Sequence, residues 1–364
     1  MSGIKPPLRL VADDLSGALD TLVQFRLPGM AWPALAVWHR RADDAAALST
    51  GTRDVSEKTA RACIAEVAPW LTAAALAYKK IDSRMRGPVA AEIAALVAHE
   101  PARRVVVAPT LPTQGRILRA GRVTTQGMAE RVDLSADLAR LGLGCALAGP
   151  GDTLPTGVSL WHAATDADLD RIAATALTAE APVTFCGSAG LAAALARAVG
   201  GHPAVRVPIA GPVLILIGTD HPVARRQVSQ IAALGAHRVI SIGPDGRGVS
   251  DVAARMAYGD SCAVTVALPP DTDRATAAVT IRQRFAALLA QLPRPGTLFA
   301  SGGATLQAVA EALGAEGIRV RGEQDAGIPA GTLSGGRWDG LAVLSKSGGF
   351  GGPESLVTIL DDAR

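Results

Sequence analysis

The chain has 364 residues, which suggests two domains, and 49% of them are hydrophobic, which is ample for large buried cores. Aromatic residues make up only 3% of the chain and the net charge is +3, which argues against a base-stacking or strongly basic nucleic-acid surface. No apolar run approaches the roughly 18 residues of a membrane span, and residues 1–10 lack the apolar core of a signal peptide. We therefore expect a soluble cytoplasmic protein.

The four cysteines lie far apart in the sequence and form no C-x-x-C pair. The six histidines show no H-E-x-x-H spacing. The sequence therefore predicts neither a zinc site nor a disulfide framework, and metal ligands remain unknown at this point. We expect the cysteines to be small buried hydrophobic residues, at Cys63, Cys145, Cys186 and Cys262.

The first predicted unit is a strand over residues 8–12, followed by Asp13 and Asp14 and by a helix from residue 16 to 25. Two adjacent carboxylates at a strand end are unfavourable when they are buried without partners. A cation, a magnesium ion or a substrate hydroxyl would offset that cost. The alternative is that one of the two residues only caps the helix.

A second strand is predicted over residues 33–38, and a polar turn over residues 49–54. In that turn, Thr52 and Arg53 either face a ligand or cap the next helix. That helix is expected to start near Ser56 and to end about residue 71.

The stretch from Lys79 to Gly87 lies between a predicted strand, residues 73–78, and a predicted helix that starts at Pro88. It carries four cationic side chains, one carboxylate and one hydroxyl. In α/β folds such a loop opens at the carboxyl end of the sheet, where ligands bind. This pattern predicts capture of a small carboxylate or phosphate, and a solvated basic turn is the alternative.

The rest of the first half continues the alternation of strands and helices. The loop over residues 109–116 presents Gln114 and Arg116, and Gly187 to Gly190 allow a close backbone approach to an anion or simply tight packing. The other predicted elements are strands at 104–108, 159–163 and 182–186, helices at 166–178 and up to 199, and a surface excursion with one helix at 121–144.

Residues 200–208 have the composition of a linker, so we place two domains at residues 1–205 and 206–364. Each is predicted to be α/β, with a mostly parallel sheet flanked by helices. The second domain is expected to have strands at 213–217, 237–242, 262–268, 297–300 and 341–344, and helices ending at 234, 292, 313 and 360.

Three loops of the second domain, starting at Gly218, Ser301 and Ser345, are rich in Gly, Ser and Thr and lead into helices. Such loops aim backbone N–H groups at phosphate oxygens, and Lys346 adds a positive charge. Neither a Walker motif nor a G-x-G-x-x-G fingerprint is present. Plain turn chemistry is the alternative for each loop taken alone.

With these motifs, the chain resembles the four-carbon acid sugar kinase family, also called the tetronate kinase or DUF1537 family. The matching segments run in family order and span nearly the whole chain. They are residues 12–18, 79–87, 108–116 and 187–191, the Gly218 loop through Gln227, Ser301 to Gly303 with Thr305, and residues 346–351.

The resemblance implies an N-terminal domain that binds an acid sugar and a C-terminal domain that binds ATP. It implies Mg²⁺ and ATP-dependent phosphorylation of a small sugar acid such as threonate, erythronate or an oxo-tetronate, and it suggests a homodimer. Substrate contacts implied by position are Asp13, Asp14, Lys79, Asp82, Ser83, Arg86 and Arg116. The implied ATP contacts are Thr219, His221, Gly302, Gly303, Ala304, Thr305 and Gly348, with Lys346 near the phosphates.

The chain departs from the family pattern at Thr219 and His221, where serines are usual, at Ala304, where an acidic residue is usual, and at Gly349, where Asn is common. Ala304 has no carboxylate with which to contact the nucleotide or its magnesium.

As a hypothesis, Lys79, Arg86 and Arg116 hold the substrate carboxylate, Asp82 and Ser83 hold its hydroxyls, and Asp13 or Asp14 accepts the proton of the attacking hydroxyl. A non-catalytic protein that binds sugar acids or nucleotides is the alternative. A third possibility is an isomerase or aldolase that works without ATP and uses Lys79 or Lys80.

Overall fold

The computed structural model describes residues 7–38, 44–126 and 131–363. The chain divides into two compact units, Met1–Pro203 and Ala204–Arg364. Both are α/β, and most strands of each unit run parallel, so the predicted fold class is confirmed. The division falls two residues before the boundary expected from composition, inside the predicted linker.

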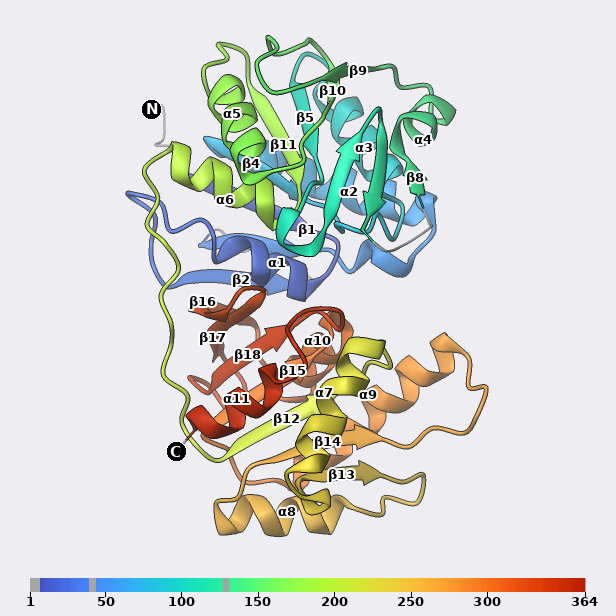
Figure 1. Cartoon of the computed structure of the whole chain (residues 1–364), viewed down its shortest axis with the longest axis vertical. Helices are drawn as coiled ribbons and strands as arrows, with labels where there is room; N and C mark the ends of the chain where they lie inside the picture. The colour runs from blue at the N-terminus through green and yellow to red at the C-terminus, as the bar shows by residue number, and fades with distance from the viewer. Residues whose placement is uncertain (1–6, 39–43, 127–130, 364) are drawn as a thin grey trace. The chain divides into compact units, whose positions relative to one another are not determined.

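The sheet of the first unit consists of parallel strands (Figure 1). Because the strands are parallel, their carboxyl ends share one edge, and the loops after neighbouring strands lie close together. In sheet order the strands are β2 (Ala34–Trp38), β3 (Ala45–Ser49), β1 (Leu8–Ala12), β4 (Leu76–Lys80), β11 (Val183–Gly187), β5 (Arg104–Ala108), β10 (Val158–Trp161) and β9 (Cys145–Ala148).

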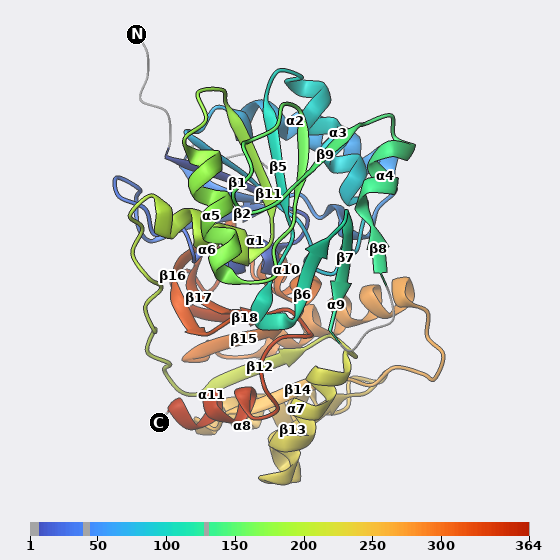
Figure 2. The ribbon, with the colours of Figure 1, turned by 45° about the horizontal axis from the view of Figure 1, so that its top comes forward.

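Helices cover both faces of this sheet. In Figures 1 and 2, α5 and α6 lie together on one side of β4, β11 and β5, and α2 and α3 lie on the other. The helix α1 contacts α6 as well as β1 and β3. The helices of this unit are α1 (Leu15–Leu22), α2 (Glu57–Thr72), α3 (Val89–His99), α4 (Leu134–Arg140), α5 (Asp166–Leu177) and α6 (Ala189–Ala198).

A small antiparallel sheet follows β5, formed by β6 (Arg116–Arg119), β7 (Arg122–Thr125) and β8 (Arg131–Asp133). It occupies part of the stretch in which the sequence predicted a surface excursion with one helix. The helix is α4, and the strands were missed because segments of three or four residues of mixed polarity give little periodic signal.

The second unit contains a parallel group of strands that ends in an antiparallel hairpin. In sheet order its strands are β13 (Val239–Ile242), β14 (Cys262–Val266), β12 (Val213–Ile217), β15 (Thr297–Ser301), β18 (Ala342–Lys346), β17 (Ile328–Ser334) and β16 (Gly317–Asp325). Its helices are α7 (Pro222–Ala233), α8 (Val249–Tyr258), α9 (Arg274–Gln291), α10 (Gly303–Ala312) and α11 (Ser355–Asp362).

Each unit has its own apolar core. In the first, Ile64 and Ile93 from α2 and α3 pack with Val107 of the sheet, and all three are fully buried. In the second, Ile215 and Phe299 pack with Ile231 of α7. No helix within the described residues combines the length and low polarity needed to cross a membrane.

Two structural expectations need correction. The strand expected at residues 73–78 is β4, which begins at Leu76 and includes Lys79 and Lys80, so these lysines lie in the sheet rather than in the loop. Of the cysteines, Cys186 and Cys262 are buried, whereas Cys63 and Cys145 are half-buried; all four are free thiols.

Candidate functional site

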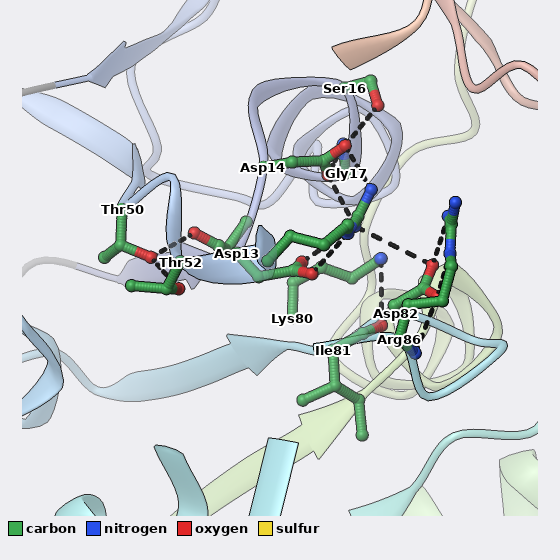
Figure 3. Close-up of polar contacts among 12 residues, drawn as sticks. Asp13, Asp14, Ser16, Gly17, Thr50, Thr52, Lys80, Ile81, Asp82 and Arg86 are labelled. Carbon is green, nitrogen blue, oxygen red and sulfur yellow. Dashed lines mark hydrogen bonds and ion pairs between the residues drawn. The ribbon is translucent and has the colours of Figure 1, made fainter. Parts of the chain in front are cut away.

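The loops after β3, β1 and β4 bring charged side chains to one edge of the first unit. Figure 3 shows Asp13 and Asp14 at the start of α1, Lys80 at the end of β4, and Asp82 and Arg86 in the loop beyond it. These side chains come from segments that are far apart in the sequence, and parallel strand order explains why they meet.

Arg53 neutralises the two adjacent carboxylates. Its Nε and Nη2 donate to the oxygens of Asp13 at 2.7 and 3.0 Å, and its Nη1 and Nη2 donate to those of Asp14 at 2.5 and 2.9 Å. Burial disfavours the arginine charge, but the carboxylates of Asp14, Asp13 and Asp82 outweigh it and raise the pKa of Arg53. The cation that the buried carboxylates required is therefore supplied by the protein.

Asp14 also caps α1. Its Oδ1 accepts a hydrogen bond from the Gly17 N–H at 2.8 Å, and its Oδ2 accepts one from the Ser16 hydroxyl at 2.9 Å. Ser56 caps α2, as its position in the sequence suggested, by accepting from the Thr59 N–H at 3.2 Å. Arg53 therefore belongs to the cluster and does not cap the helix.

Lys79 is a structural residue. Its Nζ lies 2.9 Å from Oε2 of Glu92, and both side chains are buried, at 0% and 1% exposure. Glu92 Oε1 accepts from Thr52 Oγ1 at 2.5 Å, so the pair also fixes the turn that carries Arg53. The charge of Lys79 is therefore already paired with Glu92 of α3, and a contact of Lys79 with a substrate stays a prediction.

Lys80 projects from the opposite face of β4, since side chains alternate along a strand. It is buried, and its Nζ donates to the Ile81 carbonyl at 3.0 Å. A Cβ at Gly17 would lie 3.2 Å from Lys80 Nζ and 2.6 Å from Asp14 Oδ1, so the close approach of β4 to α1 requires glycine there. Lys80 is one of the four cationic residues of the Lys79–Gly87 stretch, and strand alternation separates its side chain from that of Lys79.

The loop after β4 is held by a second ion pair. Arg86 Nε and Nη2 donate to the two oxygens of Asp82 at 2.7 and 3.0 Å. Burial alone would raise the pKa of Asp82, but the hydrogen bond from Arg86 and the charge of Arg53 hold it below its usual range. The Arg86 side chain keeps 40% exposure, so it can still face a ligand.

The backbone around Arg86 is tightly constrained. Gly87 has a φ of 86°, and a Cβ there would lie 2.7 Å from the Arg53 carbonyl oxygen. Ser83 is buried and accepts a hydrogen bond from Arg116 Nη1. Burial lowers the pKa of Arg116, which lies at the start of β6.

In the second unit, the loops after β12, β15 and β18 lie at one edge because these strands are adjacent and parallel. The loops contact one another: a Cβ at Gly348 would lie 2.7 Å from Thr219 Oγ1 and 3.3 Å from His221 Cβ. His221 Nδ1 accepts from the Val223 N–H at 3.2 Å and so caps α7. Gly302 precedes α10, whose first intrahelical bond joins the Leu306 N–H to the Gly302 carbonyl.

Lys346 lies at the end of β18 with 0% exposure, and its Nζ donates weakly to the carbonyls of Ser347 and Gly348, each at 3.4 Å. Burial lowers its pKa to about 8. Across the strand pair, the buried Ser301 hydroxyl has no hydrogen-bond partner among the described residues. A buried cation beside an unsatisfied hydroxyl suits an anionic ligand.

Gln227 of α7 holds the glycine-rich loop that follows Lys346. It is fully buried, and its Nε2 donates to the carbonyls of Phe350 at 3.2 Å and Gly352 at 2.8 Å. Gly303, Ala304 and Thr305 form the first turn of α10, which directs their N–H groups beyond the helix. Among the described residues, no group of three or more His, Cys, Asp or Glu side chains is arranged to hold a metal ion.

Asp20 is a carboxylate that the sequence analysis missed. It lies on α1, one turn beyond Gly17 and therefore on the face of the helix that meets Lys80. Burial raises the pKa of Asp20 to about 6, with Lys80 and Arg116 opposing the shift and Asp14 adding to it. In the sequence, Asp20 is one of three polar positions, with Ser16 and Thr21, in a helix whose other residues are small or apolar.

Comparison with known proteins matches two family descriptions to the chain: a sugar-binding N-terminal domain at residues 8–140 and a nucleotide-binding C-terminal domain at residues 214–356. A D-threonate kinase of Bordetella bronchiseptica is 31% identical across 97% of this chain and 96% of its own length. A D-threonate kinase of Salmonella typhimurium is 28% identical, with 96% and 97% covered. A solved structure of a Haemophilus influenzae protein of the DUF1537 family covers 98% of the chain and 99% of its own length, with a TM-score of 0.67 and 18% identity, and supports the fold.

Proposed function

The chain belongs to the four-carbon acid sugar kinase family, and from this premise we propose that it is an ATP-dependent kinase that phosphorylates a hydroxyl of a small sugar acid. The observation that carries the proposal is the match to D-threonate kinases along nearly the whole of both chains. A D-threonate-like acid is the first substrate to test. The match to kinases favours catalysis over binding alone.

The acid is proposed to bind at the carboxyl edge of the first unit. Lys80 and the exposed part of Arg86 supply positive charge for its carboxylate, together with Arg116. Ser83 accepts from Arg116, so its own proton remains available to a ligand oxygen. Asp82 contributes by orienting Arg86.

Asp13 and Asp14 are proposed to act mainly through Arg53. Their four oxygens all accept hydrogen bonds from its guanidinium, which fixes a planar donor group at the end of β3 and β1. Four of its five N–H groups are used in this way, so the guanidinium presents its remaining Nη1 N–H in one orientation. Such rigidity favours one pose of the sugar-acid hydroxyls over others.

ATP is proposed to bind to the three loops of the second unit. The first-turn N–H groups of α10, at Gly303, Ala304 and Thr305, would donate hydrogen bonds to phosphate oxygens, and Gly302 brings the backbone close to them. Lys346 would neutralise phosphate charge, because its Nζ has only weak hydrogen bonds to two backbone carbonyls and no carboxylate partner in those contacts. Thr219, His221 and Gly348 complete the loop contacts.

When Mg²⁺ is bound, it supplies charge neutralisation on the ATP phosphates. The described loops of the second unit offer no carboxylate cluster for it, and Ala304 stands where an acidic residue is usual in the family. We therefore expect the ion to arrive with ATP, held mainly by the phosphates. The homodimer suggested by family resemblance stays a prediction.

The proposal is tested by ADP release from Mg·ATP with a panel of four-carbon acids, including D-threonate, L-threonate, both erythronates and 2-oxo and 3-oxo acids. We expect one acid to stimulate ADP release far above the rate without acid. If ATP binds by calorimetry but none of the acids is phosphorylated, the protein is a binding protein or acts on another substrate class, and the kinase proposal with these acids fails.

A further inference from the structure

The cluster at the edge of the first unit contains four carboxylates near the sugar-acid site, and three of them are fully engaged. All four oxygens of Asp13 and Asp14 accept from Arg53, and Asp14 accepts two further hydrogen bonds. Both oxygens of Asp82 accept from Arg86. Each oxygen of these three carboxylates therefore already accepts a hydrogen bond from an arginine.

Asp20 differs from these three residues. It is half-buried on α1, and within the described part of the chain no hydrogen bond or ion pair occupies its oxygens. Gly17, one helical turn before it, lies against the Lys80 side chain, so Asp20 and Lys80 share the space between α1 and β4. Its carboxylate therefore has lone pairs free to meet a substrate hydroxyl.

We propose that Asp20 is the general base of the kinase, accepting the proton of the hydroxyl that attacks ATP, while Lys80 holds the acid beside it. This inference rests on the proposed function. It replaces the hypothesis that Asp13 or Asp14 is the base, and it gives those two residues the role of orienting Arg53.

In the reaction, the substrate oxygen forms a bond to the γ-phosphorus, and the bond from that phosphorus to the β,γ-bridging oxygen breaks, which leaves ADP. The hydroxyl proton moves to a carboxylate oxygen of Asp20 and is later released to water. No oxidant or further reactant is needed. General base catalysis of this kind typically contributes about 100- to 10,000-fold to the rate.

The electrostatics of the site agree with this role. Burial raises the pKa of Asp20 to about 6; the charged groups that act on it are Lys80 of β4, Asp14 at the start of α1 and Arg116 of β6. The carboxylate is therefore largely ionised at pH 7 and yet more basic than an ordinary aspartate. Below pH 6 it is protonated, so the rate should fall about tenfold for each further pH unit.

The test compares Asp20→Asn with the wild type, using the acid substrate that the wild type turns over. We expect kcat to fall by about 100-fold or more, with the KM for ATP within about threefold of the wild-type value. The acid limb of the kcat profile near pH 6 should also vanish, an effect that a purely structural role would not produce. Asp166→Asn, an exposed aspartate at the start of α5, is the matched control and should behave as the wild type.

Two further variants separate the outcomes. Asp20→Glu should restore part of kcat and keep an acid limb, because it retains the carboxylate. Lys80→Met should move that limb to higher pH, because the lysine charge lowers the pKa of Asp20. An Asp20→Asn enzyme with wild-type kcat, or with an unchanged acid limb, overturns the inference. A wild-type protein without kinase activity would instead refute the proposed function.

Discussion

The pair formed by Lys79 and Glu92 offers a direct test of the structural role assigned to Lys79. The substitution Glu92→Gln keeps an oxygen that can accept from Thr52, but it removes the charge that neutralises the buried ammonium. Breaking one side of a buried ion pair typically costs about 3–5 kcal/mol. We expect the first unit to lose stability by about that amount at pH 7.

The size of the loss has a ceiling that depends on pH. The loss cannot exceed the free energy of releasing the lysine proton, because a buried lysine without a partner can become neutral. For an ordinary lysine with a pKa of about 10.4, neutralisation at pH 7 costs about 1.36 kcal/mol for each of ~3.4 pH units, or about 4.6 kcal/mol. At pH 9 the same ceiling is only about 1.9 kcal/mol. The difference between Glu92→Gln and the wild type should therefore shrink as pH rises, because the variant's folded state binds fewer protons than its unfolded state.

Urea unfolding followed by tryptophan fluorescence suits this measurement, because four of the five tryptophans, Trp32, Trp38, Trp70 and Trp161, lie in the first unit. The matched control is Glu57→Gln, which breaks an exposed pair with Arg140 and should barely change the midpoint. A Glu92→Gln variant as stable as the wild type at pH 7, or a loss that does not shrink by pH 9, would refute this assignment. So would a large rise in the KM for the acid with unchanged stability.

Three further substitutions test the site. Arg53→Lys leaves one point charge between Asp13 and Asp14 in place of a planar donor, so kcat/KM for the acid should fall by roughly 100-fold in steady-state kinetics. An unchanged kcat/KM would show that Arg53 has no role in acid binding. Lys346→Met should raise the KM for ATP. Because burial places the pKa of Lys346 at about 8, kcat/KM for ATP in the wild type should fall above pH 8. If kcat/KM for ATP still falls above pH 8 in the variant, Lys346 does not have this role. Gln227→Leu removes two hydrogen bonds to the glycine-rich loop, so the KM for ATP should rise roughly 5- to 30-fold with the KM for the acid unchanged; equal effects on both constants would point to general destabilisation.

Many strand positions can be predicted from the hydrophobic pattern of the sequence. The strands β1, β5 and β12 lie where the apolar runs placed them, since a buried parallel strand is a largely apolar segment between turn residues. The strand β3 was missed because its sequence, Ala45–Ser49, is mostly alanine and carries little strand preference. The strand β16 was also missed, although Ile318 and Val320 are buried and Arg319 is exposed, which is the alternation of a half-buried strand.

The composition of the candidate site was predicted better than its pairing. The sequence placed Asp13, Asp14 and Arg86 near a strand edge, but it could not show that Arg53 and Asp82 would neutralise them. The pairs of Arg53 with Asp13 and Asp14 join residues about 40 positions apart, and only the strand order brings them together. Asp82 and Arg86 pair within one loop, four residues apart.

Lys79 and Asp20 show that the sequence alone does not predict the partners and the burial of a charged side chain. Lys79 looked like a ligand because it stands in a basic motif, yet its partner Glu92 lies on α3. Asp20 looked unremarkable because its basicity comes from burial and from the absence of a partner within the described residues, which are properties of the folded chain.

The central claim, that this chain transfers phosphate from ATP to a sugar acid, is tested most directly by ³¹P NMR of the reaction mixture with Mg·ATP and the active acid. We expect a new phosphomonoester resonance that grows in step with ADP and a product mass that equals the acid plus one phosphate. Release of inorganic phosphate in step with ADP, without a phosphorylated acid, would show an ATPase and contradict the account.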